Sequence, residues 1–459
     1  MSFDSLGLCD ELLKTVEEQG YTTPSPIQIK AIPAVLSQRD VMAVAHTGTG
    51  KTAGFTLPVL QLLSNVSSSR SIRSSAIQSG LVQNAPIHSA PIHSAPIHDT
   101  PIHSTQRARA KFVRALIITP TRELAAQVAL SIKNYSRHMN ISSTVVFGGV
   151  RIEPQISELQ SGLDVLVATP GRLLDLYNRQ AVNFEQLEIL VLDEADRMLE
   201  LGFIDDIRRI QMLLPTKRQS LMFSATFSKD IKSFAKGMLN NPLLIEVVTA
   251  KTTINSIKQK LHPVDKERKS EALVHLIKSN SWHQVLVFIR TKHGADSLVL
   301  KLKKVGISAA AIHADRTQHA RTHVLEEFKN RNITVLVATD IASRGIDVNQ
   351  LPCVVNFDLP YVPEDYVHRI GRTGRAGNCG LAVSLFSEDE SKQLQSIERV
   401  IGHKFELETL LGFTPSKKAS ADLLSDNDNN DNNEDEYGNF EADPKPRVRG
   451  QSQGRRNRK

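Results

Sequence analysis

Residues 45–52 read AHTGTGKT, and this short stretch decides the fold class. It follows an apolar run at 41–45 and precedes a helical pattern, the context in which backbone N–H groups converge on an anion at a helix N-terminus. Gly48 and Gly50 let the backbone approach that anion closely. Lys51 would reach the β- and γ-phosphates of a nucleotide, and the Thr52 hydroxyl would hold Mg²⁺. The stretch therefore predicts a phosphate-binding loop in an α/β domain.

Short apolar runs alternate with amphipathic stretches on both sides of this loop, which is typical of a parallel sheet flanked by helices. Helical patterns follow at 122–139 and 171–179. A polar, non-periodic stretch at 249–255 interrupts the alternation, which then restarts. We expect strands at 41–45, 115–119, 144–147, 164–168, 189–192 and 220–223, and again at 285–289, 309–312, 334–338, 354–357 and 381–386.

This pattern predicts two tandem α/β domains of similar build. The predicted boundaries are an N-terminal region at 1–30, a first domain at 31–248, a linker at 249–256, a second domain at 257–415 and a tail at 416–459. An insertion at 66–110 interrupts the first domain.

The insertion carries four Pro-Ile-His triplets, which place His88, His93, His98 and His103 five residues apart. Proline at this spacing excludes a helix and a central strand. The tract is either a weak metal-binding segment or a disordered surface insertion, and its low complexity favours the second.

The tail divides by charge. Residues 426–443 carry eight acids and no Lys or Arg, whereas 445–459 carry seven bases and no acid. Such a segment cannot bury a core, so we expect disorder. Its basic end would contact nucleic-acid phosphates or would simply be solvated, and we favour the contact.

The whole composition is that of a globular protein. The chain has 459 residues, and 56 Lys and Arg against 49 Asp and Glu give a net charge of +7, which permits a polyanionic partner without requiring one. Cys9, Cys353 and Cys379 lie too far apart for a disulfide framework or a cysteine zinc site. No apolar run approaches the roughly 20 residues that cross a bilayer, and the N-terminus lacks a secretory signal pattern. We therefore expect a cytoplasmic protein.

An acidic cluster, Asp193-Glu194-Ala195-Asp196, follows the expected strand at 189–192. An acid at the carboxyl end of a buried strand faces the crevice in which open α/β sheets bind ligands. Asp193 would fix the Mg²⁺ shell, and Glu194 would polarise the attacking water as a general base. Together with the phosphate-binding loop, this cluster predicts nucleotide hydrolysis.

The same four residues resemble the signature of the DEAD-box RNA helicases, and other motifs of that family occur in family order over residues 1–400. The opening MSFDSLGL at 1–8 and TGKTAGF at 49–55 look most like the bacterial RhlE branch. The resemblance implies two RecA-like domains, ATP and Mg²⁺ as cofactors, RNA as the partner and ATP-dependent RNA unwinding as the activity. Ribosomal precursor particles or the RNA-degradation machinery are further partners that it suggests.

For the nucleotide, the resemblance implies that Gln28 reads the adenine edge and that Phe3 stacks on the ring. Arg372 and Arg375 would be arginine fingers, which act in catalysis with Glu194 and Lys51. The full set of implied nucleotide contacts is Phe3, Gln28, Ala45, His46, Thr47, Gly48, Thr49, Gly50, Lys51, Thr52, Gly345 and Asp347.

For RNA, the family motifs imply contacts to phosphates and 2′-hydroxyls rather than to base edges, and hence sequence-independent binding. The implied RNA-contacting residues are Thr121, Arg122, Gly148, Gly149, Thr169, Arg172, Arg290, Gln318, Arg321, Thr339, Asp340 and Arg344. The residues implied to couple hydrolysis to strand separation are Asp196, Ser224, Thr226 and His368.

Two positions depart from the family pattern. His46 stands where the family usually has Gln, and we expect little effect because the loop acts through backbone amides. Ala314 follows His313 where glycine is common, and a positive φ there would strain the turn.

The catalytic groups are divided between the two predicted domains, so we expect hydrolysis to require closure of one domain on the other. ATP and RNA would each favour that closed state. An ATP-gated RNA clamp or annealing chaperone and a DNA translocase remain alternatives to a helicase. Strand separation and the relative stimulation by DNA and RNA distinguish these alternatives.

Overall fold

The computed structural model describes residues 2–45, 48–64, 112–247, 257–343, 348, 351–374 and 380–416, without the side chains of residues 341 and 343. The insertion predicted at 66–110, the linker predicted at 249–256 and the tail beyond residue 416 lie outside these ranges. The predictions made for those segments therefore stay predictions.

The first sheet has seven strands in the order β3-β4-β2-β5-β6-β1-β7, and all its neighbours pair in parallel. The strands are β1 (Val41–Val44), β2 (Ala115–Ile118), β3 (Ser143–Val146), β4 (Val165–Ala168), β5 (Ile189–Leu192), β6 (Gln219–Ser224) and β7 (Leu243–Glu246).

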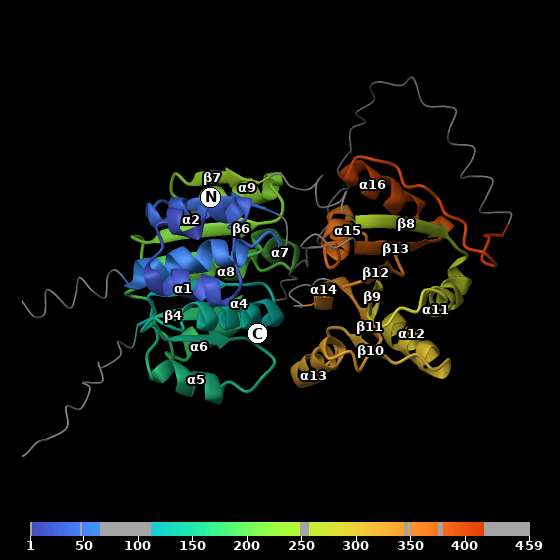
Figure 1. Cartoon of the computed structure of the whole chain (residues 1–459). Coiled ribbons are helices and arrows are strands. Elements are labelled where there is room, and N and C mark those ends of the chain that lie inside the picture. Colours follow the sequence, from blue (N-terminus) through green and yellow to red (C-terminus); the bar gives the residue numbers. More distant parts are fainter. Residues whose placement is uncertain are drawn as a thin grey trace, which may run out of the picture. The chain divides into compact units, whose positions relative to one another are not determined.

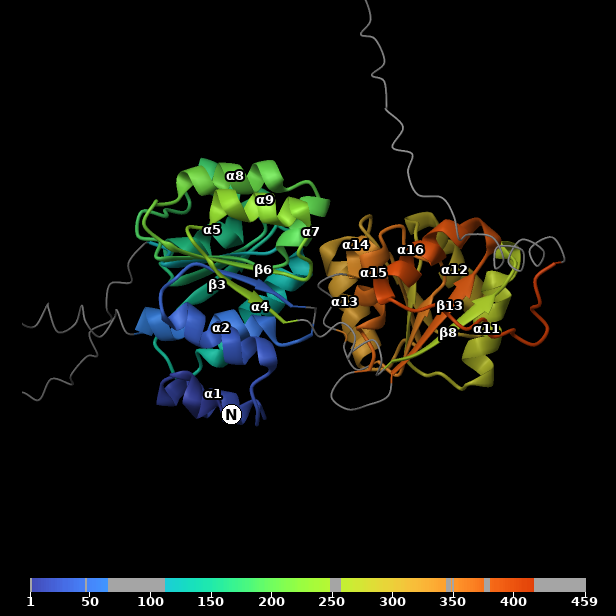
Figure 2. The same cartoon turned by 90° about the horizontal axis from the view of Figure 1, so that it is seen from above.

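Helices cover both faces of this sheet, because successive strand residues point to opposite faces and both sets are apolar. Ala115 and Ile117 belong to one hydrophobic cluster, whereas Leu116 and Ile118 belong to the other. Figure 2 shows α1 and α2 on one side of the sheet and α8 and α9 on the other. The elements are η1 (Phe3–Leu6), α1 (Asp10–Glu18), α2 (Pro26–Leu36), a helix over residues 51–64, α4 (Arg122–Tyr135), α5 (Glu153–Gln160), α6 (Pro170–Asn178), α7 (Ala195–Glu200), α8 (Ile204–Leu213) and α9 (Lys229–Met238).

The second sheet has six strands in the order β10-β11-β9-β12-β13-β8, again entirely parallel (Figure 1). The strands are β8 (Ile257–Pro263), β9 (Val285–Phe288), β10 (Ala309–Ile312), β11 (Val335–Ala338), β12 (Cys353–Asn356) and β13 (Gly380–Phe386). The helices are η2 (Lys266–Arg268), α11 (Lys269–Ser279), α12 (Lys292–Lys304), α13 (Gln318–Lys329), α14 (Asp340–Ser343), α15 (Pro363–Ile370), η3 (Glu388–Glu390) and α16 (Ser391–Ile401).

These two sheets confirm the predicted pair of parallel α/β domains, and each of the eleven expected strands lies within one residue of its predicted bounds. Strands β7 and β8 were not predicted. Both are edge strands, and charged or exposed residues such as Glu246, Lys258 and Lys260 break their apolar pattern. The helix predicted over 122–139 ends earlier, at Tyr135.

Ala314 is not among the described non-glycine residues with positive φ. The strain that would follow from such a φ is therefore absent from this turn. Among the described residues, no helix is both long and apolar enough to span a membrane.

Candidate nucleotide and RNA sites

The strand order of the first sheet divides the predicted site residues into two adjacent groups along one edge. Carboxyl ends of parallel strands meet at the same edge, so the loops that follow them are neighbours. The adjacent strands β5, β6 and β1 lead into the acidic cluster at 193–196, the stretch 224–226 and the phosphate-binding loop. The adjacent strands β3, β4 and β2 lead into the predicted RNA contacts Gly148, Gly149, Thr169, Arg172, Thr121 and Arg122.

The phosphate-binding loop has the backbone that its glycines were expected to allow. Gly48 and Gly50 have φ of +81° and +91°. Lys51 begins the helix over residues 51–64, is only 7% exposed, and its Nζ has no hydrogen-bond partner among the described residues. A buried ammonium without a partner is costly, so this geometry suits an anionic ligand. His46 and Thr47 lie outside the described residues, and the nucleotide contacts predicted for Ala45, Thr49 and Thr52 remain predictions.

Gln28 connects α2 to this loop. Its Oε1 accepts a hydrogen bond from the Ser25 backbone N–H (2.8 Å), and its Nε2 donates to the Gly50 carbonyl (3.2 Å). A Cβ at Gly50 would lie 2.5 Å from Gln28 Nε2, so this packing requires glycine. The sequence did not reveal this supporting contact, because the adenine contact predicted for Gln28 says nothing of residue 50.

Phe3 packs inside the first domain. It is 5% exposed, and its ring stacks on Tyr21 with the ring centroids 6.5 Å apart. The predicted stacking of Phe3 on adenine stays a prediction.

Asp193 follows β5 and is 3% exposed. Burial raises its pKa to about 7, against the opposing field of Lys51, and the neighbouring Glu194 carboxylate raises it further. A buried carboxylate whose burial outweighs the attraction of the one nearby lysine fits a divalent cation, which Asp193 and Thr52 would hold. No group of three or more His, Cys, Asp or Glu side chains in the described part of the chain could hold a metal. Mg²⁺ does not need such a group, because it binds to one or two protein oxygens and takes its other ligands from phosphates and waters.

Glu194 has a left-handed backbone, with φ of 53° and ψ of 52°. Non-glycine residues adopt this conformation at a cost of about 1–3 kcal/mol, often at functional sites. The strained turn changes the chain direction between β5 and α7.

Asp196 joins α7 to the loop after β6. Its Oδ2 accepts hydrogen bonds from the backbone N–H groups of Ala225 and Thr226, both at 3.0 Å. The Thr226 N–H also lies 3.3 Å from Ser224 Oγ. The structure therefore brings together three residues predicted to couple hydrolysis to strand separation, although their role remains a prediction.

Two arginines predicted to contact RNA lie beside the backbone after β3. A Cβ at Gly149, whose φ is +76°, would lie 2.0 Å from Arg122 Nη1. Arg172 donates through Nη2 to the Val150 carbonyl (2.9 Å), and its buried Nη1 has no partner. Burial lowers the pKa of Arg172, the Asp175 carboxylate 4.0 Å from its Nε opposes this, and the positive charge of Arg122 acts in the same direction as burial. The arrangement suits a phosphate, because it presents donors without an equal number of acceptors.

The two threonines of this group lie at helix N-termini. Thr121 caps α4 by accepting from the Leu124 N–H (3.3 Å), and Thr169 is 9% exposed at the start of α6. Capping explains Thr121 without RNA, so its predicted contact has no independent support.

In the second domain, Arg369 forms a bidentate salt bridge with Asp340. Its Nε donates to Oδ1 (2.6 Å) and its Nη2 donates to Oδ2 (2.7 Å). Arg369 also donates to the Asp358 carbonyl (2.6 Å) and to Asn356 Oδ1 (3.2 Å). The sequence did not single out Arg369, which is 2% exposed and connects the ends of β11 and β12 to α15. Arg344, Gly345, Asp347 and Arg375 are outside the described residues.

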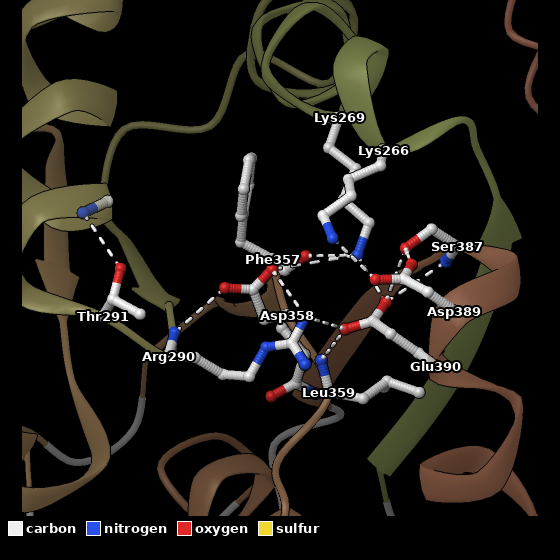
Figure 3. Close-up of polar contacts among 12 residues, drawn as sticks. Lys266, Lys269, Arg290, Thr291, Phe357, Asp358, Leu359, Ser387, Asp389 and Glu390 are labelled. Atoms are coloured by element: carbon white, nitrogen blue, oxygen red, sulfur yellow. Dashed lines mark hydrogen bonds and ion pairs between the residues drawn. The ribbon is translucent and has the colours of Figure 1, made fainter.

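A second polar cluster lies at the carboxyl ends of β9, β12 and β13 (Figure 3). Its centre is Glu390, whose side chain is fully buried and which accepts from Lys269 Nζ (2.5 Å) and Arg290 Nη2 (3.1 Å). The backbone N–H groups of Leu359 (3.0 Å) and Ser387 (3.2 Å) also donate to it. Arg290 was predicted from a motif, whereas nothing in the sequence relates Glu390 to Lys269, 121 positions earlier.

Some predicted residues of the two domains meet. Gln318 Nε2 and Arg321 Nη2 lie 3.0 and 2.9 Å from Glu123 Oε1, next to Arg122. One small pocket is lined by Glu194, Asp196, His368 and Arg372, together with Arg197 and Glu200 of α7 and with Ala225 after β6. Thr339, at 9% exposure, follows β11.

The sequence and the structure of this chain were compared with those of known proteins, and the matches are helicases. A DEAD/DEAH box helicase profile matches residues 25–234, and a helicase conserved C-terminal domain profile matches residues 268–377. The DEAD-box ATP-dependent RNA helicase RhpA of Helicobacter pylori is 37% identical over 406 residues, which cover 88% of this chain and 74% of RhpA. ATP-dependent RNA helicase RhlB of Pseudomonas syringae is 36% identical over 410 residues, 89% of this chain and 94% of RhlB.

Two further matches agree. The DEAD-box ATP-dependent RNA helicase CshA of Geobacillus kaustophilus is 37% identical over 405 residues, 88% of this chain and 78% of CshA. The solved structure of Saccharomyces cerevisiae Dbp5 bound to RNA and ADP BeF3 matches with a TM-score of 0.72 and 29% identity, over 89% of this chain and 95% of that one.

Fold and site together define an ATPase of the phosphate-binding-loop class with two tandem RecA-like domains. The chain belongs to the family of DEAD-box ATP-dependent RNA helicases. Its activity is that of an RNA-dependent ATPase and helicase.

Proposed function

We propose that this chain uses ATP hydrolysis to open RNA duplexes locally and without regard to sequence. The observation that supports it most directly is the order of strands in the first sheet. The unpartnered Lys51 lies at one part of the carboxyl edge, and the Arg122 and Arg172 guanidinium groups follow neighbouring strands of the same edge. An ATP phosphate and an RNA phosphate would therefore bind to one rigid sheet.

Each predicted residue has a part in this scheme. Lys51 would bind the β- and γ-phosphates, and Asp193 with Thr52 would hold Mg²⁺, which neutralises phosphate charge when bound. Glu194 would take a proton from the attacking water. Arg372 and Arg375 of the second domain would stabilise the charge of the transition state, so hydrolysis would need both domains.

RNA would bind through its backbone. The guanidinium groups and backbone amides after β2, β3 and β4 suit phosphates and 2′-hydroxyls, so we propose a preference for RNA over DNA and none for sequence. The Asp196 contacts with Ala225 and Thr226 would couple ATP hydrolysis at the acidic cluster to the RNA-binding residues along the same edge of the sheet.

The cellular setting is also a proposal. The opening residues suggest the RhlE branch, although RhpA, RhlB and CshA are each 36–37% identical to this chain. We propose a cytoplasmic protein that acts in ribosome assembly or RNA turnover, with ribosomal precursor particles or degradation enzymes as partners.

Strand separation tests the proposal. The wild type with ATP should unwind a short RNA duplex, and Glu194→Gln should not, because it lacks the base for hydrolysis but keeps the phosphate contacts. Equal strand separation by both proteins would favour an ATP-gated clamp. Equal stimulation of ATP hydrolysis by DNA and RNA would favour a DNA translocase.

A further inference from the structure

Tyr361 is an exposed aromatic residue in a tightly held loop. The residue is 71% exposed, whereas Leu359 and Pro360 before it are buried and Pro363 begins α15 two residues later. Single exposed aromatic residues are common and need no explanation by themselves. The contacts that hold this one in place distinguish it.

Arg290 lies over the Tyr361 ring, with the guanidinium carbon 5.1 Å from the ring centroid. The guanidinium itself is fixed, since its Nη2 is 3.1 Å from Glu390 Oε1 and 3.7 Å from Asp358 Oδ1. A stacked guanidinium restrains the ring and leaves its other surface accessible.

The backbone of the loop is fixed as well (Figure 3). The Phe357 N–H donates to the Phe288 carbonyl (2.9 Å), and the Phe357 carbonyl accepts from Lys269 Nζ (3.0 Å). The Leu359 N–H donates to Glu390 (3.0 Å). Because the loop is already ordered, little conformational entropy is lost when a ligand stacks on Tyr361.

The position of Tyr361 in the sheet indicates what would stack there. The residues predicted to contact RNA follow β10, β11 and β9, which are consecutive in the sheet, and Tyr361 follows β12, the next strand. All four strands are parallel, so Tyr361 lies at the same edge and extends the row of predicted contacts by one strand.

We propose that Tyr361, held by Arg290, is a stacking platform for an unpaired RNA base next to the backbone-binding groove. An aromatic face accepts any base, so this contact adds affinity for single strands without sequence preference. The proposal rests on RNA being the partner under the proposed function, and it adds a base contact to a site otherwise built for phosphates.

The test measures binding of the full-length protein to a labelled single-stranded oligouridine in the presence of a non-hydrolysable ATP analogue. Tyr361→Ala should raise the Kd about 5- to 100-fold, because loss of one stacked base has this effect. Tyr361→Phe should bind like the wild type. Val362→Ala, which alters the exposed neighbour, is the matched control and should also leave the Kd unchanged.

An abasic oligonucleotide of the same length separates stacking from other effects. With this probe the wild type and Tyr361→Ala should have equal Kd values, because no base is present to stack. A difference that persists, or equal binding of oligouridine by the wild type and Tyr361→Ala, would overturn the platform. Failure of the proposed function looks different, since the wild type itself would then not bind oligouridine.

Discussion

Two glycines with the same φ differ in whether a side chain at their position would disturb a predicted RNA contact. Gly149 and Gly202 both have φ of +76°. A Cβ at Gly202 would meet nothing within 4 Å, whereas a Cβ at Gly149 would collide with the Arg122 guanidinium. Only at Gly149, therefore, does glycine make room for a residue that is predicted to contact RNA.

We predict that Gly149→Ala and Gly202→Ala both lose about 1 kcal/mol of stability, since both place a side chain in a left-handed conformation. Only Gly149→Ala should also weaken RNA binding, because it displaces Arg122. Thermal unfolding and RNA titration of the two variants would check this. A similar loss of RNA affinity in Gly202→Ala would show that backbone strain alone explains the effect.

Lys51 gives a prediction for the nucleotide. Ligand that binds only the folded state stabilises it, by about 2.7 kcal/mol at one hundred times the Kd. An ATP analogue with Mg²⁺ should raise the melting temperature of the wild type and leave that of Lys51→Ala nearly unchanged. Lys30→Ala is the control, since Lys30 is an exposed lysine of the same domain whose Nζ donates to the Glu246 carbonyl. An undiminished shift in Lys51→Ala would contradict the phosphate contact.

Single residues could be predicted from the sequence where nearby positions in the chain determine their place in the fold. Lys51 and Asp193 each follow a strand within a few positions, so the spacing alone placed them at the edge of the sheet. The hydrogen bonds of Gln28 and Glu390 could not be predicted in this way. Their partners, Gly50 and Lys269, are 22 and 121 residues away, and only the fold brings them together.

Among the elements, η3 shows how two adjacent acids differ in what they stabilise. Glu390 is buried and bonds to groups that follow β9, β12 and β13, whereas the Asp389 side chain is 44% exposed and pairs with Lys266 at the surface. A buried ion pair that loses one partner leaves the other charge uncompensated.

We predict that Glu390→Ala lowers the free energy of unfolding by about 3–5 kcal/mol, because the buried Lys269 loses its nearest carboxylate and keeps only Asp358, 3.9 Å away, within salt-bridge distance among the described residues. Asp389→Ala should cost less than about 1 kcal/mol, as exposed pairs do. Trp282, the single tryptophan of the chain, packs against the core of the second domain, so its fluorescence during urea unfolding follows this domain. Equal midpoints for the two variants would show that Glu390 does not hold the strand ends together.

Strands were predictable where the pattern was apolar and buried on both faces, as in β5 and β11. The edge strand β8 was not predicted, because Lys258 and Lys260 interrupt its apolar pattern, although the strand pairs with β13 over seven positions. A sheet edge needs only one paired side, and its composition need not resemble that of a central strand.

For the whole molecule, the predicted division of catalytic groups between two domains has a thermodynamic consequence. Lys51, Asp193 and Glu194 belong to the domain of the first sheet, and Arg372 belongs to the domain of the second. If closure assembles both the ATP site and the RNA groove, each ligand binds the closed state better. The two affinities are then coupled, and the coupling must be the same in both directions.

We predict this reciprocity for Glu194→Gln, in which ATP stays intact during the measurement. RNA should lower the Kd for ATP by some factor, about 5- to 150-fold for typical couplings, and saturating ATP should lower the Kd for RNA by the same factor. Adding Arg372→Ala should reduce both factors together, because the second domain then loses its predicted contact with the γ-phosphate. Isothermal titration in each order measures the two values. If ATP and RNA bind independently in Glu194→Gln, each domain holds its ligand alone, and closure does not explain how hydrolysis is coupled to RNA.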